Sequence, residues 1–173
     1  FDFQVNNYLD ATGGAVTFNN TGTVRKTSSG GTAGFVNNGG TVTFNNAGDL
    51  EVQSGTLALS SFSQTGAGSV LVGAVTVFQG SGVSTDDLTV AAEASFTFTD
   101  GNHTLSATAD FGGAGTIGLS NGTLNVQGTL TSPTFNLSGG TLNLAGTLTV
   151  DVMNWSYGAV VNGLGMGLID IPM

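Results

Sequence analysis

The sequence predicts an all-β chain wound as a single-stranded parallel β-helix (a β-solenoid), and three observations support this fold class. Residues 13–22 return 26 positions later as residues 39–48, with eight of ten residues identical. Residues 120–132 return 18 positions later as residues 138–150, with nine of thirteen identical. Apolar and small polar residues alternate in short runs, and no 3.6-residue periodicity is visible. Self-similarity at a short period is typical of a chain that stacks many copies of one small unit.

Short strands are predicted wherever apolar residues alternate with Thr, Asn or Ser. Period-2 alternation places one face of a strand in a core and the other in water. Each run ends within a few residues at Gly, Asn or Ser, which tolerate the backbone conformations of turns. We expect about fifteen short strands and no helix. The clearest strands are residues 16–18, 42–44, 57–59, 96–98, 124–126, 135–137, 142–144 and 148–150.

The spacing of one motif predicts the shape of each coil. Gly-Thr-Leu or Gly-Thr-Ile begins at six places, and from Gly122 to Gly146 the starts are separated by multiples of six residues. Eighteen residues then hold three turn-plus-strand units, which make one triangular coil. The 26-residue spacing near the N-terminus suits a larger coil with longer corners. About six to eight coils at the usual strand spacing give a rod of about 30–40 Å.

Two other folds remain as alternatives. A Greek-key sandwich would link antiparallel neighbours through Asn-Gly turns, but its copies need not recur in register. A left-handed hexapeptide solenoid also has an 18-residue period and carries an aliphatic residue at every sixth position. Leucines at positions 124, 130, 142 and 148 obey that rule, whereas Asn136 and Asn154 break it. We expect right-handed winding, the general preference of parallel crossover connections.

Stacked coils lay equivalent residues above one another, so like side chains should form columns. Inward Leu, Val and Phe then build an apolar column, each side chain contributing about 1.5–3 kcal/mol when buried. Asparagines that follow strands at matching positions can form amide ladders along the rod. The candidates are Asn19–Asn20, Asn37–Asn38 and Asn45–Asn46, with plain turns as the alternative.

Composition narrows the class of partner and the location. The net charge is −9, and Arg25 and Lys26 are the only cations. This balance repels phosphate backbones and anionic lipid headgroups, so no nucleic-acid partner is expected. Membrane insertion is not expected either, because no stretch approaches the ~20 apolar residues of a membrane span. A surface rich in Thr, Asn and Ser but poor in Lys favours an extracellular or cell-surface location.

Few residues offer chemistry, and we expect no enzymatic activity, no cofactor and no metal site. His103 is the single histidine and is expected in a solvated turn, where zinc would lack further ligands. Asp86 and Asp87 are adjacent, so they could touch calcium in a turn, whereas on a strand they point to opposite faces. A polysaccharide lyase would need Arg25 or Lys26 to neutralise a uronate, and one of these neighbours must point away from the other.

Pairs of the form Thr-x-Thr suggest a weaker alternative, an ice-binding solenoid whose flat threonine array orders water. These pairs skip coils and are interrupted by asparagine, which favours ordinary outward threonines on strands. The pairs are Thr41/Thr43, Thr97/Thr99, Thr129/Thr131 and Thr147/Thr149.

The chain divides into a β-solenoid of residues 1–151 and an apolar C-terminal segment of residues 152–173. That segment is an assembly strand, a cap or the start of a further repeat. The first residues alternate like a strand, and exposed strand edges recruit partners. Two apolar ends predict end-to-end self-association, with a piece of a longer solenoid or a self-contained tail as alternatives. The predicted assembly residues are Phe1, Phe3, Val5, Met153, Trp155, Tyr157, Leu168, Ile169 and Ile171.

Residues 18–24 (FNNTGTV) and 44–60 (FNNAGDLEVQSGTLALS) resemble repetitive bacterial β-helix surface proteins. This group includes adhesin stalks, filamentous haemagglutinin-like proteins and autotransporter passengers, and the likeness covers roughly residues 13–165. It implies a right-handed parallel β-helix, an extracellular address and a structural or adhesive role, such as a surface stalk or a filament subunit. The alternative function is a carbohydrate-binding or carbohydrate-degrading β-helix, with glycans contacting the Thr, Asn and Ser faces.

Overall fold

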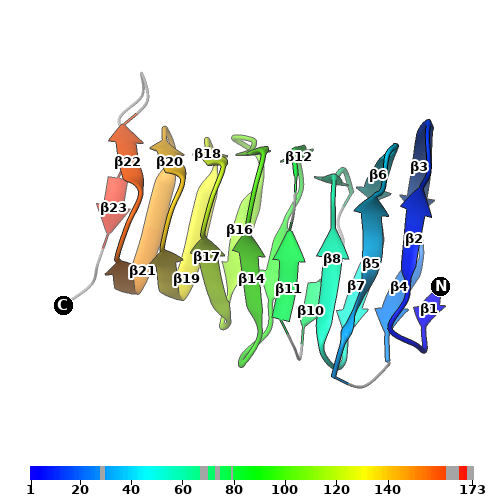
Figure 1. Cartoon of the computed structure of the whole chain (residues 1–173). Coiled ribbons are helices and arrows are strands. Elements are labelled where there is room, and N and C mark those ends of the chain that lie inside the picture. Colours follow the sequence, from blue (N-terminus) through cyan, green and yellow to red (C-terminus); the bar gives the residue numbers. More distant parts are fainter. Residues whose placement is uncertain (28–29, 67–69, 73–74, 79, 163–167, 171–173) are drawn as a thin grey trace.

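The protein is a β-solenoid of about seven turns, seen in a computed structural model. The structure describes residues 1–27, 30–66, 70–72, 75–78, 80–162 and 168–170. Every regular element in these residues is a strand, and neighbouring strands pair in parallel. Figure 1 shows the strands side by side along a rod, from β1 beside the N-terminus to β23 near the C-terminus. The predicted parallel β-helix is therefore confirmed, and the Greek-key sandwich is wrong.

Each complete coil contributes one strand segment to each of three faces, and two long strands near the C-terminus each run across two faces without a break. Face 1 contains β1 (Asp2–Phe3), β4 (Thr23–Lys26), β7 (Asp49–Val52), β10 (Val70–Val72), β13 (Leu88–Val90), β16 (Asp110–Gly113), the first parts of β19 (Thr129–Leu137) and β21 (Thr147–Trp155), and β23 (Leu168–Asp170). Face 2 contains β2 (Tyr8–Ala11), β5 (Thr32–Asn37), β8 (Thr56–Leu59), β11 (Val75–Phe78), β14 (Ser95–Phe98), β17 (Thr116–Leu119), and the second parts of β19 and β21. Face 3 contains β3 (Ala15–Asn20), β6 (Thr41–Asn46), β9 (Phe62–Gln64), β12 (Gly82–Ser84), β15 (Asn102–Leu105), β18 (Thr123–Val126), β20 (Thr141–Leu144) and β22 (Ala159–Asn162).

The two repeated segments of the sequence are neighbouring strands on face 3. Phe18 of β3 pairs in register with Phe44 of β6, and Thr123 of β18 pairs with Thr141 of β20. Each pairing joins the two copies of one repeated segment, so both predicted periods are the lengths of real coils. The expectation of about fifteen strands is wrong, because the structure describes 23. The very short strands in the middle of the chain have no close copy that would reveal them.

The core runs along the axis of the rod as columns of inward side chains. One column on face 3 carries Phe18, Phe44 and Phe62, and continues as Leu124 and Leu142. The rings of Phe18 and Phe44 lie 5.5 Å apart and nearly parallel. This column is thus filled by phenylalanine in the first three coils and by leucine near the C-terminus.

One corner of the rod requires glycine in three successive coils. Gly101, Gly122 and Gly140 precede the first residues of β15, β18 and β20, with φ of 72°, 77° and 75°. A Cβ on Gly122 would lie 2.3 Å from the carbonyl oxygen of Gly101 in the coil below. Glycine is needed here both for the positive φ and for the close approach of the two backbones.

Candidate functional site

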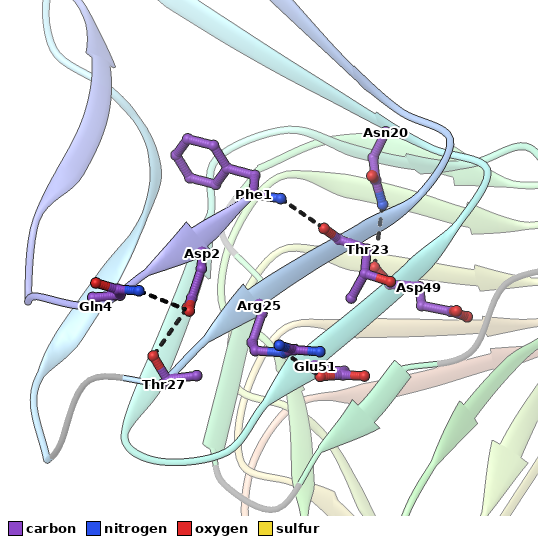
Figure 2. A network of polar contacts seen from close by, with 9 residues as sticks. All are labelled: Phe1, Asp2, Gln4, Asn20, Thr23, Arg25, Thr27, Asp49 and Glu51. Atoms are coloured by element: carbon purple, nitrogen blue, oxygen red, sulfur yellow. Dashed lines mark hydrogen bonds and ion pairs between the residues drawn. The ribbon is translucent and has the colours of Figure 1, made fainter.

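The N-terminal end of the rod is fastened by polar contacts on face 1 (Figure 2). The N-terminal ammonium of Phe1 donates to the carbonyl oxygen of Thr23 at 2.9 Å. The Thr27 hydroxyl donates to Oδ1 of Asp2 at 3.0 Å. These contacts add to the strand pairing of β1 with β4 and hold the first coil against the second.

The same end exposes apolar side chains along the axis of the rod. Phe1 is 57% and Val5 63% exposed, and the exposed residues also include Tyr8 and Val16. Phe3 is buried, with its ring edge-on to Phe35 at 5.4 Å between centroids. The first coil therefore exposes several apolar side chains among polar ones, above a buried aromatic layer.

The C-terminal end contains a pocket with aromatic walls. Its volume is about 570 Å³, and it is lined by Gly140, Trp155, Ser156, Tyr157, Gly158 and Ala159. Trp155 pairs in register with the buried Leu137, so it is the outermost described residue of an inward column. The indole Nε1 donates to the carbonyl oxygen of Gly158 at 3.3 Å, which orients the ring. Trp155 and Tyr157 remain 55% and 76% exposed because no further described strand covers face 2 beyond β21.

The structure places the predicted assembly residues in two groups at opposite ends of the rod (Figure 1). Phe1, Phe3 and Val5 belong to the first coil, although Phe3 is buried. Met153 is partly buried against the core, whereas the aromatic pair and the two aliphatic residues of β23 are exposed. Ile171 lies outside the described residues. Contact between two such ends stays a prediction. The predicted set omitted Tyr8, Val16, Val152 and Val161, which their place in the outermost coils could have marked.

Most of the large apolar side chains that are described as exposed lie at the ends of the rod. Among the side chains that the structure describes, every large exposed hydrophobic residue except Val83 belongs to the terminal coils. The strand edges are open at the same places. Within the described residues, β3 pairs only with β6, and β22 pairs only with β20. Each end thus combines apolar side chains with backbone groups that lack a strand partner.

His103 lies in the core, so the prediction of a solvated turn is wrong. It is 1% exposed on β15, and its Nε2 lies 3.0 Å from the Ser84 hydroxyl. The turn ends at Gly101, and His103 then takes the same inward phase as Leu105. The absence of a side chain on Gly82, one coil below, makes room for the imidazole. Desolvation lowers the pKa of His103 to about 3, so the ring is neutral in the folded protein.

Arg25 and Lys26 point to opposite sides of β4, as predicted for adjacent strand residues. Arg25 faces outward and forms an ion pair with Glu51, shown in Figure 2, and the hydrogen bond to Glu51 raises the pKa of the guanidinium. Lys26 is fully buried, and its Nζ donates to the carbonyl oxygen of Ser54 at 2.7 Å. Burial lowers the pKa of Lys26. Neither cation is among the residues that line the pocket at the C-terminal end or the groove on face 1 described next.

Asp87 and Asp110 border a shallow groove on face 1. Its volume is about 290 Å³, and it is lined by Asp87, Leu88, Thr89, Asp110, Phe111, Gly112, Thr129 and Thr131. Gly112 leaves a gap between the outward side chains of Thr89 and Thr131. Asp87 Oδ1 accepts a hydrogen bond from the Asp110 backbone at 3.0 Å. Asp86 is not among the lining residues, so the adjacent aspartates do not act on this groove together.

Asparagine ladders form at two of the three predicted pairs. Asn45 donates to Asn19 at 2.9 Å on the outer surface, and Asn20 donates to Asn46 at 2.7 Å inside the core. The buried ladder continues, because Asn46 donates to Gln64 at 2.8 Å. Asn37 and Asn38 are instead involved in other contacts, with the backbone of Val42 and the carboxylate of Asp10. Outward ladders also join Asn125 to Asn143 and Asn136 to Asn154.

The threonine pairs of β19 and β21 stack directly, contrary to the expectation that such pairs skip coils. Thr129 pairs with Thr147, and Thr131 with Thr149. The next coil interrupts this array, because Asp110 and Gly112 hold the equivalent positions. The array is therefore limited to two rows at this place on face 1.

The described residues contain no group of three or more His, Cys, Asp or Glu placed to hold a metal ion. No helix in the described part of the chain has the length and hydropathy that a membrane span needs. The chain matches no family model, no curated protein and no solved structure. What the geometry offers is therefore a class of architecture, a parallel β-solenoid whose described terminal coils expose apolar side chains.

Proposed function

We propose that this protein is a structural component, an extracellular rod that serves as a surface stalk or as the subunit of a filament. One observation carries the proposal, which is the unbroken register of parallel strands along the described chain. Every coil is joined to the next by backbone hydrogen bonds on three faces and by a continuous core. Such a rod can extend only by detaching one coil after another, because each coil is held by its immediate neighbours. The resemblance to bacterial β-helix surface proteins supports an extracellular address.

Labelling of intact cells tests the location. Antibodies raised against the folded chain should label unpermeabilised cells. Chymotrypsin added outside the cells should digest those chains that unfold, and it should thereby lower the signal. Trypsin is a poor probe, because the chain contains only two Lys and Arg residues. Labelling that appears only after permeabilisation would contradict the proposed location.

Single-molecule pulling from the two termini tests the mechanical role. We expect stepwise extension, with each step releasing one coil of about 18 to 26 residues, or about 60–90 Å of extended chain. This pattern follows because each coil is stabilised by its immediate neighbours. Collapse of the whole chain in one low-force step would argue against a load-bearing rod.

A glycan-binding role is the second candidate, and the groove at Gly112 favours it. The groove offers threonine hydroxyls and the Asp110 carboxylate, groups that can bind sugar hydroxyls, but no cation lines it. A neutral glycan is therefore a better fit than a uronate. Binding on a glycan array that is lost in Gly112→Gln would support this candidate. A screen on acidic polysaccharides tests the non-enzymatic proposal, and turnover abolished by Arg25→Ala would overturn it.

A further inference from the structure

We propose that the C-terminal end of one copy of this chain stacks on the N-terminal end of a second copy, so that the three faces continue across the joint. This inference rests on the proposed structural function and names its partner. It also gives a use to the features that distinguish the ends from the body of the rod.

The distribution of apolar surface supports an interface at the ends. Val16 on β3 is 42% exposed, and Trp155 on β21 is 55% exposed, although both belong to inward rows. Their partners in the adjacent coil are covered. Val42, which pairs with Val16, and Leu137, which pairs with Trp155, are fully buried. Stacking a second copy would remove apolar area from water in the same way that each internal coil does.

Inward columns at one end match inward columns at the other. The column that ends in Trp155 runs through successive coils back to Leu9 of β2. Val160 of β22 occupies the column of Phe18 on face 3. A second copy placed one strand spacing further along the rod therefore brings apolar residues over apolar residues on both faces.

Strand direction selects head-to-tail contact. The strands of each face run parallel, so the C-terminal edge of one copy and the N-terminal edge of another pair in parallel when the rods point the same way. Contact between two N-terminal ends would instead place strands antiparallel. A head-to-tail contact leaves one free end on each side, so it propagates into a filament.

The unequal size of the terminal coils does not prevent the joint. The wide coil, from Phe18 to Phe44, advances the chain by 26 residues, whereas the narrow coil, from Thr123 to Thr141, advances it by 18. The chain already contains one such step, because the wide coil that ends at Phe44 is followed by a narrow coil that ends at Phe62. In that step Phe44 and Phe62 remain stacked at 6.1 Å. A narrow coil can thus sit on a wide one with its core column intact.

The test uses three valine-to-lysine variants of the full chain. Val16→Lys places a charge in the inward row of β3 at the N-terminal end, and Val160→Lys places one in the inward row of β22 at the C-terminal end. Val83→Lys is the control for an added lysine, because Val83 is 45% exposed and lies in an outward row in the middle of the rod. Lysine on an open edge opposes strand pairing. We expect each end variant to raise the dissociation constant for self-association about tenfold or more, and the control to leave it unchanged.

Sedimentation velocity gives a decisive pattern. Wild type and Val83→Lys should form species that grow with concentration up to about 100 µM. Each end variant alone should remain monomeric, whereas their equimolar mixture should form dimers and nothing larger, since one intact end remains on each. Wild type that stays monomeric would overturn the proposal. Dimers formed by one end variant alone would overturn it too, because they require contact between like ends.

The single tryptophan supplies an independent readout that also guards against misfolded variants. Trp155 is 55% exposed at the proposed joint, so its emission should shift to the blue when ends meet. The shift should appear in wild type and in the mixture, but in neither end variant alone. Circular dichroism must first show that both variants keep the strand signal. A mixture of folded variants without dimers or a shift, beside a wild type that associates, would rule out head-to-tail stacking.

Discussion

Polar side chains enter the core of this rod where each finds a partner in the next coil. His103 meets Ser84, Asn46 joins Asn20 to Gln64, and the Lys26 ammonium meets a backbone carbonyl oxygen. A buried polar group without a partner costs about 1–3 kcal/mol, whereas a satisfied one costs little. These residues therefore tie the register of particular coils more strictly than leucine could.

The buried imidazole makes stability depend on pH in a definite direction. The pKa of His103 is about 3 in the folded chain and 6.5 in the unfolded reference. As pH falls below 6.5 the unfolded chain binds a proton that the folded chain excludes, so the free energy of unfolding decreases until about pH 3. Between pH 7.5 and 5 the expected loss is about 2 kcal/mol. Urea unfolding at both pH values measures it.

His103→Leu is the control for this prediction. The variant keeps an inward side chain beside Leu124 and loses the titrating group, so its stability should change little between pH 7.5 and 5. An equal loss in the variant and the wild type would show that the pH dependence has another source.

Substitutions at two adjacent asparagines compare the stability that a buried ladder contributes with the stability that an exposed ladder contributes. Asn46 is fully buried and bonds to Asn20, Gln64 and the Gly48 carbonyl oxygen, so Asn46→Ala leaves several buried groups without partners. The expected loss is about 2–4 kcal/mol. Asn45→Ala removes one exposed bond to Asn19 and should cost less than about 1 kcal/mol. Equal losses in thermal or urea unfolding would contradict this assignment.

At the scale of elements, close packing between coils depends on residues that lack a side chain. A Cβ on Gly82 of β12 would lie 1.6 Å from the carbonyl oxygen of Phe62 and 3.2 Å from Nδ1 of His103. Gly82→Ala must therefore shift β12 and should destabilise the fold by about 2 kcal/mol or more. Gly22→Ala is the matched control, because its Cβ would meet nothing within 4 Å. Similar unfolding midpoints for both variants would refute the close approach.

The strands were predicted best where the two copies of a repeated segment are most similar in sequence. The pairs β3–β6 and β18–β20 followed directly from repeated segments, because stacked positions favour the same residues. Between them the length of the coil varies, and the coil from Ser95 to Thr116 is longer than the coil from Phe44 to Phe62. Extra residues in the corners change the number of residues per coil there. The sequence repeat is then not visible, so several strands were not predicted.

The candidate site was predicted in outline only. Sequence identified both ends as apolar, because alternation at the N-terminus and a long apolar run at the C-terminus were visible. It could not show that Phe3 is covered, since burial there depends on Phe35 from another coil. The prediction for His103 failed for a similar reason. Its sequence DGNH resembles a turn, and only the inward phase shared with Leu105 indicated a strand residue.

At the scale of the whole molecule, stability should be distributed along the rod rather than uniform. Within the described residues, internal coils pair with a coil on both sides, whereas the terminal coils pair on one. Hydrogen exchange should therefore be slowest in β14, β17 and β18 and fastest in β1 and β23, since terminal coils open at lower free energy. Mass-spectrometric exchange at low protein concentration measures this order. Uniform protection along the chain would indicate a single cooperative unit.

The repeated in-register contact of β18 and β20 has a consequence for how such a chain can evolve. Removing residues 123–140 would place Gly122 directly before Thr141, in the same corner that Gly140 now provides. Duplication or loss of a whole coil leaves each remaining neighbourhood intact, whereas an insertion of an odd number of residues inside a strand reverses which side chains face inward. Duplication or deletion of a whole coil in the gene can therefore lengthen or shorten the rod by about 4.8 Å at a time, without requiring a new core.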